Sequence, residues 1–182
     1  MEPAAQVIWT VGHSTRSEEE FVDLLQGFGI TLLADVRRFP GSRRYPHFGS
    51  EALASTLRAG GIDYRHLPEL GGRRRPQPDS PNGVWRNLAF RGYADHMASA
   101  EYRAAFDALC ERARAQRTAV MCAERLWWQC HRSMLADDLV LHGWEVVHIL
   151  EAGKSSPHAF REPARLVDDA PVYGPAAQPS LL

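Results

Sequence analysis

Apolar and polar positions along the chain predict a regular alternation of strands and helices. Five short apolar runs are typical of buried strands, and they cover residues 7–11, 31–36, 62–67, 118–122 and 145–150. Between these runs, apolar side chains recur at the spacing of one helix face, as they do from Phe21 to Phe28. The alternation favours an α/β fold, a single domain with a mostly parallel sheet of about five strands flanked by helices. A short barrel-like closure of the strands is the alternative.

Helix boundaries follow from residues that cap helices. Ser17 and Glu20 have the spacing of a capping box, in which each side chain bonds to the backbone N–H of the other residue. Ser50 and Ser99 are expected to cap the next two helices of the chain. A later helix is expected to start within residues 130–133.

Irregular segments follow from proline, glycine and charge. Residues 40–49 and 71–90 combine Pro, Gly and Arg, and both are predicted to be loops. A loop as long as the second is usually a lid, a binding loop or disordered. We expect an α/β domain at 1–154 and an irregular C-terminal tail at 155–182, because that tail lacks helical or strand periodicity.

Cysteine count and apolar run length indicate where the protein is found. Three cysteines are too few for the disulfide framework of a secreted domain, and the N-terminus lacks the pattern of a signal peptide. No apolar run approaches the ~20 residues of a membrane-spanning helix. We therefore expect a soluble cytoplasmic protein that does not contact membranes, and both a monomer and a homodimer remain open.

Arginine is concentrated in the middle of the chain. Of the 21 basic residues, Lys154 is the one lysine, and between Val36 and Tyr93 eleven arginines stand against four acids. A GC-rich genome explains a general preference for Arg over Lys, but not its clustering in predicted loops. In these loops Arg alternates with aromatic residues, as in Arg43-Arg44-Tyr45. That pattern is typical of surfaces that hold phosphates by cations and exposed bases by stacking.

Polar side chains follow the predicted strands at the points where the strands end. In chain order these residues are His13, Ser14, Asp35, Arg37, Glu69, Cys122 and Glu124. The carboxyl ends of parallel strands meet at one edge of a sheet, and ligands of α/β proteins bind outside that edge. The sequence therefore predicts a composite polar site there.

The densest group of reactive side chains lies within residues 118–132. Its last three residues, Cys130-His131-Arg132, fall where a helix is expected to start, so backbone N–H groups and the helix dipole favour an anion there. Arg37 and Arg132 are expected to clamp a phosphate or carboxylate. An ion pair of Arg132 with Asp35 or Glu124 is the alternative.

Several segments together resemble the DUF488 family of bacterial and archaeal proteins. They are TVGHSTR (10–16), DVRRFPGSRR (35–44), LPELGG (67–72), FRGYADHM (90–97), and MCAE (121–124) followed by CHR (130–132). The resemblance extends from residue 7 to about residue 150 and keeps the order of the motifs. It implies an α/β domain and marks these residues as the family's signature, while the family name assigns no activity.

The leading hypothesis is an enzyme, of hydrolase or transferase type, that acts on a nucleotide or nucleic-acid substrate. Asp35 and Glu124 are the candidate acid/base pair, His13 a proton carrier or orienting group, and Cys130 completes the candidate catalytic set. The expected substrate-binding residues are Ser14, Arg37, Arg43, Glu69, Trp127, Trp128, His131 and Arg132.

Two other functions remain open. The first is a thiol- or zinc-dependent enzyme on a small anionic substrate, because a thiol at a helix N-terminus beside Arg and His favours its thiolate. Cys122 is then the partner of Cys130, although their spacing is not that of a zinc knuckle. The second is a non-catalytic nucleic-acid-binding module. For Trp127 and Trp128, a lid on the core or a dimer contact is the alternative. The sequence identifies no cofactor, and we assign no metal ligand.

Overall fold

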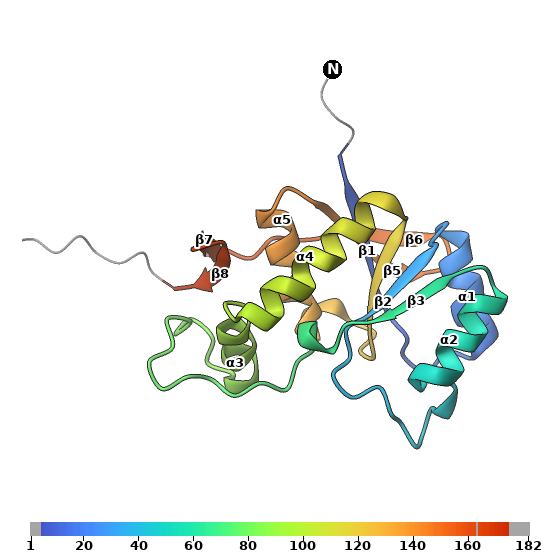
Figure 1. Ribbon diagram of the computed structural model, residues 1–182, viewed down its shortest axis with the longest axis horizontal. Coiled ribbons are helices and arrows are strands. Elements are labelled where there is room, and N and C mark those ends of the chain that lie inside the picture. The colour runs from blue at the N-terminus through green and yellow to red at the C-terminus, as the bar shows by residue number, and fades with distance from the viewer. Residues whose placement is uncertain (1–4, 163, 175–182) are drawn as a thin grey trace, which may run out of the picture.

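A computed structural model describes residues 5–162 and 164–174, which form an open six-stranded sheet with helices on both faces (Figure 1). The strands are β1 (Val7–Gly12), β2 (Leu32–Asp35), β3 (Asp63–His66), β4 (Thr118–Cys122), β5 (Glu145–Glu151) and β6 (Lys154–Pro157). Their order is β3-β2-β4-β1-β5-β6; the first five run parallel, and β6 pairs antiparallel with β5. The predicted α/β fold with a mostly parallel sheet is confirmed, and the barrel alternative is wrong.

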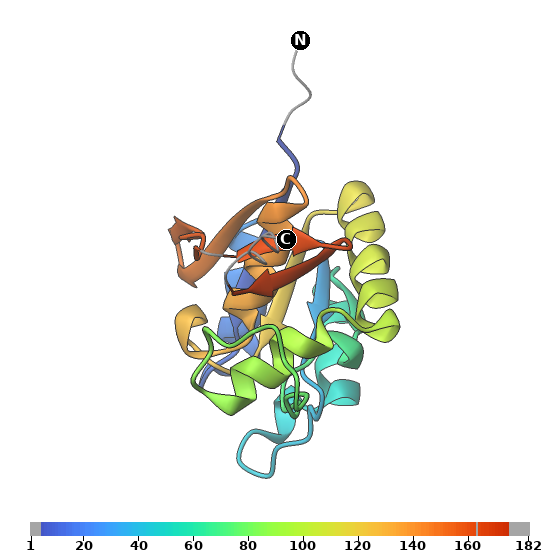
Figure 2. The ribbon, with the colours of Figure 1, turned by 90° about the vertical axis from the view of Figure 1, so that its left-hand side faces the viewer.

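Five helices cover the sheet, as Figures 1 and 2 show. One face carries α1 (Glu18–Gly27) and α2 (Ser50–Ala59), and the other carries α3 (Leu88–His96), α4 (Ala100–Ala115) and α5 (Arg132–Leu141). The side chains of successive β4 residues point to opposite faces of the sheet. Ala119 and Met121 pack with α1 and α2, and Val120 packs with α4 and α5. The strand is buried on both sides for this reason, which explains its continuous apolar run.

The helix boundaries confirm most of the predicted caps. Ser17 and Glu20 form the capping box, with bonds of 3.1 and 2.9 Å, and the Ser99 side chain accepts from the N–H of Tyr102. The prediction for Ser50 is wrong, because Gly49 is the N-cap of α2 and Ser50 is its first helical residue. Helix α5 begins at Arg132, within the expected window.

The predicted loops contain more structure than expected. Within 40–49, the 3₁₀ turn η1 (Pro46–Phe48) buries Phe48 completely in the core. The irregular segment predicted at 71–90 ends early, because α3 begins at Leu88 after the cap Asn87. Helix α3 was hidden in the sequence by Gly92, which breaks the apolar pattern. At that position a Cβ would collide with the backbone of Arg74, so glycine lets the long loop lie against the helix.

The prediction of an irregular tail is wrong for three segments in the part of it that the structure describes, because these segments are strands. Strand β6 extends the main sheet past residue 154, and β7 (Ala164–Val167) pairs with β8 (Ala170–Tyr173) in a separate two-stranded sheet. Strand β8 is buried, and Tyr173 packs in the same core cluster as α4 and α5. Residues 163 and 175–182 of the predicted tail lie outside the described residues.

The carboxyl ends of β1, β2 and β4 meet at one edge of the sheet, as expected. Gly12 lies opposite Cys122, and Asp35 lies opposite Met121. The N–H of His13 donates to the carbonyl of Cys122 at 2.9 Å, which carries the pairing one residue beyond β1. This edge holds the candidate site. In the described part of the chain, no helix has both the length and the apolar character needed to cross a membrane.

Candidate functional site

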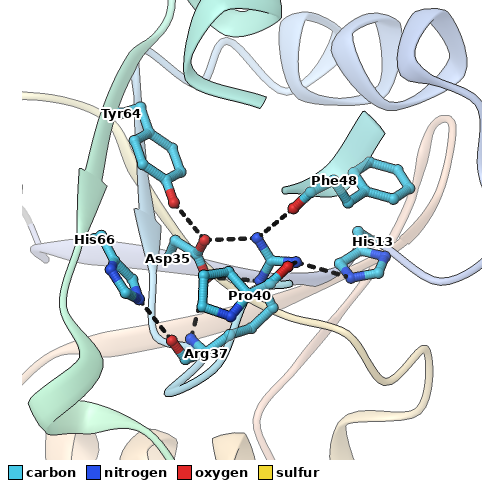
Figure 3. Close-up of polar contacts among 7 residues, drawn as sticks. All are labelled: His13, Asp35, Arg37, Pro40, Phe48, Tyr64 and His66. Carbon is cyan, nitrogen blue, oxygen red and sulfur yellow. Dashed lines mark hydrogen bonds and ion pairs between the residues drawn. The ribbon is translucent and has the colours of Figure 1, made fainter. Parts of the chain in front are cut away.

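Asp35 ends β2 and is fully engaged by its neighbours (Figure 3). Its Oδ1 accepts from the backbone N–H and the Nε of Arg37, at 3.1 and 2.9 Å, and its Oδ2 accepts from Arg37 Nη2 at 2.7 Å and from the Tyr64 hydroxyl at 2.6 Å. The side chain is completely buried. A carboxylate has about four lone-pair positions, and all four are used here. Asp35 therefore has no free position for a substrate proton.

Arg37 is also saturated. Besides its bonds to Asp35, its Nη2 donates to the carbonyl of Phe48 at 2.7 Å, and its Nη1 donates to the carbonyl of Pro40 at 3.3 Å and to His13 Nε2 at 3.4 Å. Its five N–H groups are thereby occupied, so none remains to clamp a phosphate. The predicted clamp of Arg37 with Arg132 has no support in this geometry. The ion pair of Arg37 with Asp35 instead fixes the loop after β2.

His13 is held neutral as part of this network. Its Nδ1 donates to the carbonyl of Ser14 at 2.9 Å, which leaves Nε2 as the acceptor for Arg37, and its ring stacks on Phe48 at 4.2 Å between centroids. Burial, followed by the charge of Arg37, lowers the pKa of His13 to about 4, although the bond to Ser14 opposes the shift. His13 thus orients Arg37.

Two cysteines lie together beside this network. Cys122 is the last residue of β4 and Cys130 precedes α5, and their Sγ atoms are 3.1 Å apart. Cys130 Sγ accepts the backbone N–H of Arg132 at 3.2 Å, and the Cys122 thiol donates to the carbonyl of Glu124 at 3.6 Å. Both thiols are free, and both residues are buried, with 2% and 5% of their surface exposed.

A buried arginine, Arg132, follows the thiol pair in the chain and contacts it through its backbone N–H. Arg132 is 2% exposed, and its Nη2 donates to the backbone carbonyls of Glu124 and Arg125, at 3.1 and 3.3 Å. Its Nε and Nη1 are enclosed without a hydrogen-bond partner among the described residues. The alternative ion pair with Asp35 or with the Glu124 carboxylate does not form. A buried guanidinium without a carboxylate favours negative charge nearby, and the pKa values of both thiols are lowered by its charge.

The two thiols differ in acidity. The pKa of Cys122 is lowered to about 7, first by the hydrogen bond from Cys130 and then by the charge of Arg132, against the opposing effect of burial. The pKa of Cys130 is raised well above its ordinary value because its S–H is held by Cys122 and because it is buried. Cys122 is therefore the more acidic thiol of the pair, and its thiolate form is partly populated near neutral pH.

A cavity of about 200 Å³ opens over the sulfur atoms. Its lining comes from the ends of β2 and β4, the glycine turn after η2 (Pro68–Leu70) and the start of α5, namely Arg37, Arg38, Phe39, Gly72, Arg73, Cys122, Ala123, Glu124, Cys130 and His131. Arg38 donates to the carbonyl of Arg73 at 2.7 Å, and both guanidiniums lie over the ring of Phe39, at 5.2 and 5.8 Å. The mouth of the cavity is cationic and carries an exposed ring, since Phe39 is 60% exposed.

Two glycines permit this close packing. A Cβ on Gly12 would overlap the backbone carbonyl of Glu124, so glycine lets the 123–131 loop lie against the end of β1. A Cβ on Gly72 would come within 2.7 Å of His131 Nδ1. Burial, followed by the charges of Arg132 and Arg74, lowers the pKa of His131 to about 4, so this ring is a neutral wall of the cavity.

Other predicted site residues lie away from the cavity. Trp127, in the 3₁₀ turn η3 (Trp127–Gln129), stacks on His148 at 4.3 Å with rings 5° from parallel, and Trp128 is 49% exposed beside it. Neither tryptophan lines the cavity. Arg43 is exposed in the loop after β2, Ser14 faces a different hollow, and the backbone carbonyl of Glu69 accepts from His96.

Sequence reasoning missed several residues that the structure brings to the site. Tyr64 binds Asp35, while Arg38, Phe39 and Arg73 line the cavity. The strand register was a usable signal for Tyr64, because β3 pairs with β2 so that Tyr64 lies opposite Leu33, two residues before Asp35. Arg38 and Phe39 belong to the motif at 35–44 that carries the family resemblance, and Arg73 belongs to the loop predicted at 71–90, but none of the three was predicted as a site residue.

The zinc alternative lacks a complete set of ligands. In residues 5–162 and 164–174, no three His, Cys, Asp or Glu side chains gather closely enough to hold a metal ion. His13, near the thiol pair, uses its two ring nitrogens on Ser14 and Arg37 and has none free for a metal ion.

The comparison with known families gives one match. Residues 17–139 match the family described as "Domain of unknown function DUF488". No curated protein and no solved structure matches the chain. The match covers more than half of the 182 residues and includes the motifs around Asp35 and Cys130.

Proposed function

Because the chain belongs to the DUF488 family, a domain of unknown function, its chemistry has to be inferred from the site, and we propose a cysteine-dependent enzyme acting on a small anionic substrate. In this proposal Cys122 is the nucleophile. Cys130 and Arg132 stabilise its thiolate, and the arginines at the cavity mouth bind the substrate.

The observation that carries the proposal is the position of Arg132. This buried guanidinium has two enclosed nitrogens without hydrogen-bond partners, and its Nη2 and the Cys122 sulfur both contact the carbonyl oxygen of Glu124, at 3.1 and 3.6 Å. A buried charge that lacks a counter-ion costs several kcal/mol, by the order of magnitude that holds for such groups. A thiolate on Cys122 supplies the counter-ion, and thiolates are the reactive form of cysteine.

The cavity supports a small, negatively charged substrate. Its volume of about 200 Å³ is below the ~300–1,000 Å³ that is typical of sites for larger ligands. Arg38 and Arg73 line the cavity, and so do Cys130 and His131, the two residues before α5. The charge of Arg37 is already balanced by Asp35, so the arginines at the entrance carry the attraction for an anion.

Competing alkylating reagents test the proposal. Iodoacetamide is neutral and iodoacetate is anionic, so their relative rates at Cys122, followed by peptide mass, report both thiolate character and attraction for anions. We expect Cys122 to react with both, and to favour iodoacetate more than free cysteine does. Arg73→Gln should reduce this preference, while Arg86→Gln, an exposed arginine away from the cavity, should leave it unchanged.

Two results count against the proposal. If Cys122 resists both reagents until the protein unfolds, it is not a nucleophile. If Cys122 reacts but the preference for iodoacetate equals that of free cysteine in every variant, the substrate is not an anion bound by these arginines.

A nucleotide substrate is a second candidate, and the exposure of Phe39 favours it. An aromatic ring that is 60% exposed at the mouth of a cationic cavity provides a surface for stacking a base. In this candidate, the phosphate lies in the cavity and the base on Phe39. Replacing a stacking aromatic residue costs about 1–3 kcal/mol per base.

Calorimetry with adenosine monophosphate and ribose 5-phosphate tests this candidate. Phe39→Leu should weaken binding of the nucleotide and spare the sugar phosphate, and Leu88→Ala, at an equally exposed apolar site, should change neither. Equal affinity of both ligands for the wild-type protein would argue against stacking.

A further inference from the structure

We propose that Cys122 and Cys130 form a reversible disulfide in the reaction cycle, and that the substrate attacked by Cys122 is a small hydroperoxide. The proposal rests on the proposed function, because it requires Cys122 to be a nucleophile. It goes further in naming the electrophile and the group that completes the reaction.

The group nearest to Cys122 is a second thiol. Cys130 Sγ lies 3.1 Å from the Cys122 sulfur, within the range of a hydrogen bond between the two thiols. An acyl or phosphoryl group on Cys122 would need a water molecule and a base to release it, and the fully engaged carboxylate of Asp35 cannot act as that base. A sulfenic acid on Cys122 needs neither, because a neighbouring thiol resolves it directly.

The enclosure of the sulfur atoms selects a small oxidant. Cys122 and Cys130 are 2% and 5% exposed and are reached through a cavity of about 200 Å³. A disulfide of another protein cannot approach sulfur atoms buried to this degree, whereas hydrogen peroxide or a small organic hydroperoxide can enter.

The first step oxidises Cys122. Its thiolate attacks the terminal oxygen of the hydroperoxide, the S–O bond forms, and the O–O bond breaks. Cys122 becomes a sulfenic acid, and the departing alkoxide takes the proton of the Cys130 thiol and leaves as an alcohol. The guanidiniums of Arg38 and Arg73 stabilise negative charge as it develops on the leaving oxygen.

The second step forms the disulfide. The thiolate of Cys130 attacks the Cys122 sulfur, the S–S bond forms, and the S–O bond breaks. The hydroxide that leaves takes a proton from solvent and becomes water. Two electrons have passed from the two sulfurs to the peroxide, and an external thiol reductant restores both thiols by exchange.

The chain between the cysteines can accommodate the bond. The sulfur atoms must approach from 3.1 Å to the ~2.05 Å of a disulfide. Residues 123–125 and 128–129 of the connecting loop are exposed, so they can adjust without disturbing the core.

Intact mass and peptide mapping after treatment with hydrogen peroxide test the proposal. The wild-type protein should lose two hydrogen atoms and give a cross-linked peptide of Cys122 with Cys130, which dithiothreitol reverses. Cys130→Ser should instead gain one oxygen at Cys122, trapped by dimedone. Cys122→Ser should resist oxidation at low peroxide, and Cys110→Ser, at a thiol remote from the pair, should behave as wild type.

The outcomes distinguish failure of the disulfide cycle from failure of the proposed function on which it rests. If the wild-type Cys122 accumulates sulfenic or sulfinic acid without a cross-link, or reacts with iodoacetamide but not with peroxide, the disulfide cycle is wrong and the nucleophile stands. If Cys122 reacts with neither reagent in the folded protein, both proposals are wrong.

Discussion

Asp35 and Arg37, two residues apart at the end of β2, form a two-point ion pair that leaves neither side chain free for a ligand. Both lie close to the thiol cavity, and Arg37 forms part of its wall. The pair fixes the loop that carries Arg38 and Phe39 to the cavity mouth. Its role in this account is structural, in contrast to the acid/base role that the sequence suggested for Asp35.

Asp35→Asn should destabilise the fold. The substitution leaves Arg37 charged and buried without a counter-ion, and breaking a buried pair in this way typically costs about 3–5 kcal/mol. Urea unfolding followed by circular dichroism measures the change. Glu151→Gln is the matched control, because its pair with Arg125 is exposed and such pairs are worth about 0–1 kcal/mol. Equal effects of the two substitutions would contradict the structural role of Asp35.

Gly12→Ala should disturb the thiol pair from a distance. The new methyl group would overlap the carbonyl of Glu124, so the 123–131 loop has to move, at a cost of about 1–3 kcal/mol. Because Cys130 lies in this loop, alkylation of Cys122 should change as well. Gly83→Ala is the control, since its Cβ would meet no atom within 4 Å. If Gly12→Ala has the stability and the Cys122 labelling of the wild-type protein, the close contact between Gly12 and Glu124 does not determine the position of the loop.

Stability should fall as the solution becomes more acidic. Burial lowers the pKa of His13 to about 4 and that of His148 to about 2, the second aided by His158. Below about pH 6.5 the unfolded chain binds protons on these rings while the folded protein does not. The free energy of unfolding therefore falls by at most ~1.4 kcal/mol for each ring with every unit by which the pH is lowered. Denaturant titrations at several pH values check this, and His148→Gln should flatten the decline.

His142 should act in the opposite direction. Asp138 accepts hydrogen bonds from this ring and raises its pKa to about 9, so folding favours its charged form. This contribution is complete below about pH 6.5 and is lost as the pH rises through 9. His142→Gln should therefore lower stability at neutral pH and remove part of the alkaline decline, in the same titrations. An unchanged alkaline limb in the variant would contradict the assignment.

The sequence predicts the main sheet well because its central strands are buried on both faces. Thr118–Cys122 and Val7–Gly12 read as apolar runs, and the polar residues after them identify the edge of the site. Strand β6 was missed because Lys154–Pro157 is a largely exposed edge strand whose residues carry no apolar signal. Pairing with β5, not local preference, makes it a strand.

The sequence predicted many of the residues at the site, but not which of their side chains contact one another. The sequence brought Cys122, Cys130 and Arg132 to one edge, but nothing in their spacing showed that Arg37 would satisfy Asp35 or that Trp127 would turn toward His148. Those choices depend on side-chain packing across strands. The expected cytoplasmic location, nucleotide partner and possible homodimer stay predictions.

The pH dependence of Cys122 alkylation tests the central claim most directly. Iodoacetamide labelling of the folded protein, followed by peptide mass at a series of pH values, should give a midpoint of about 7 at Cys122. Cys130→Ala should move the midpoint upward, because the S–H donor is lost. A wild-type midpoint at or above the ~8.5 of an ordinary cysteine would contradict the claim that Cys122 is a thiolate at neutral pH.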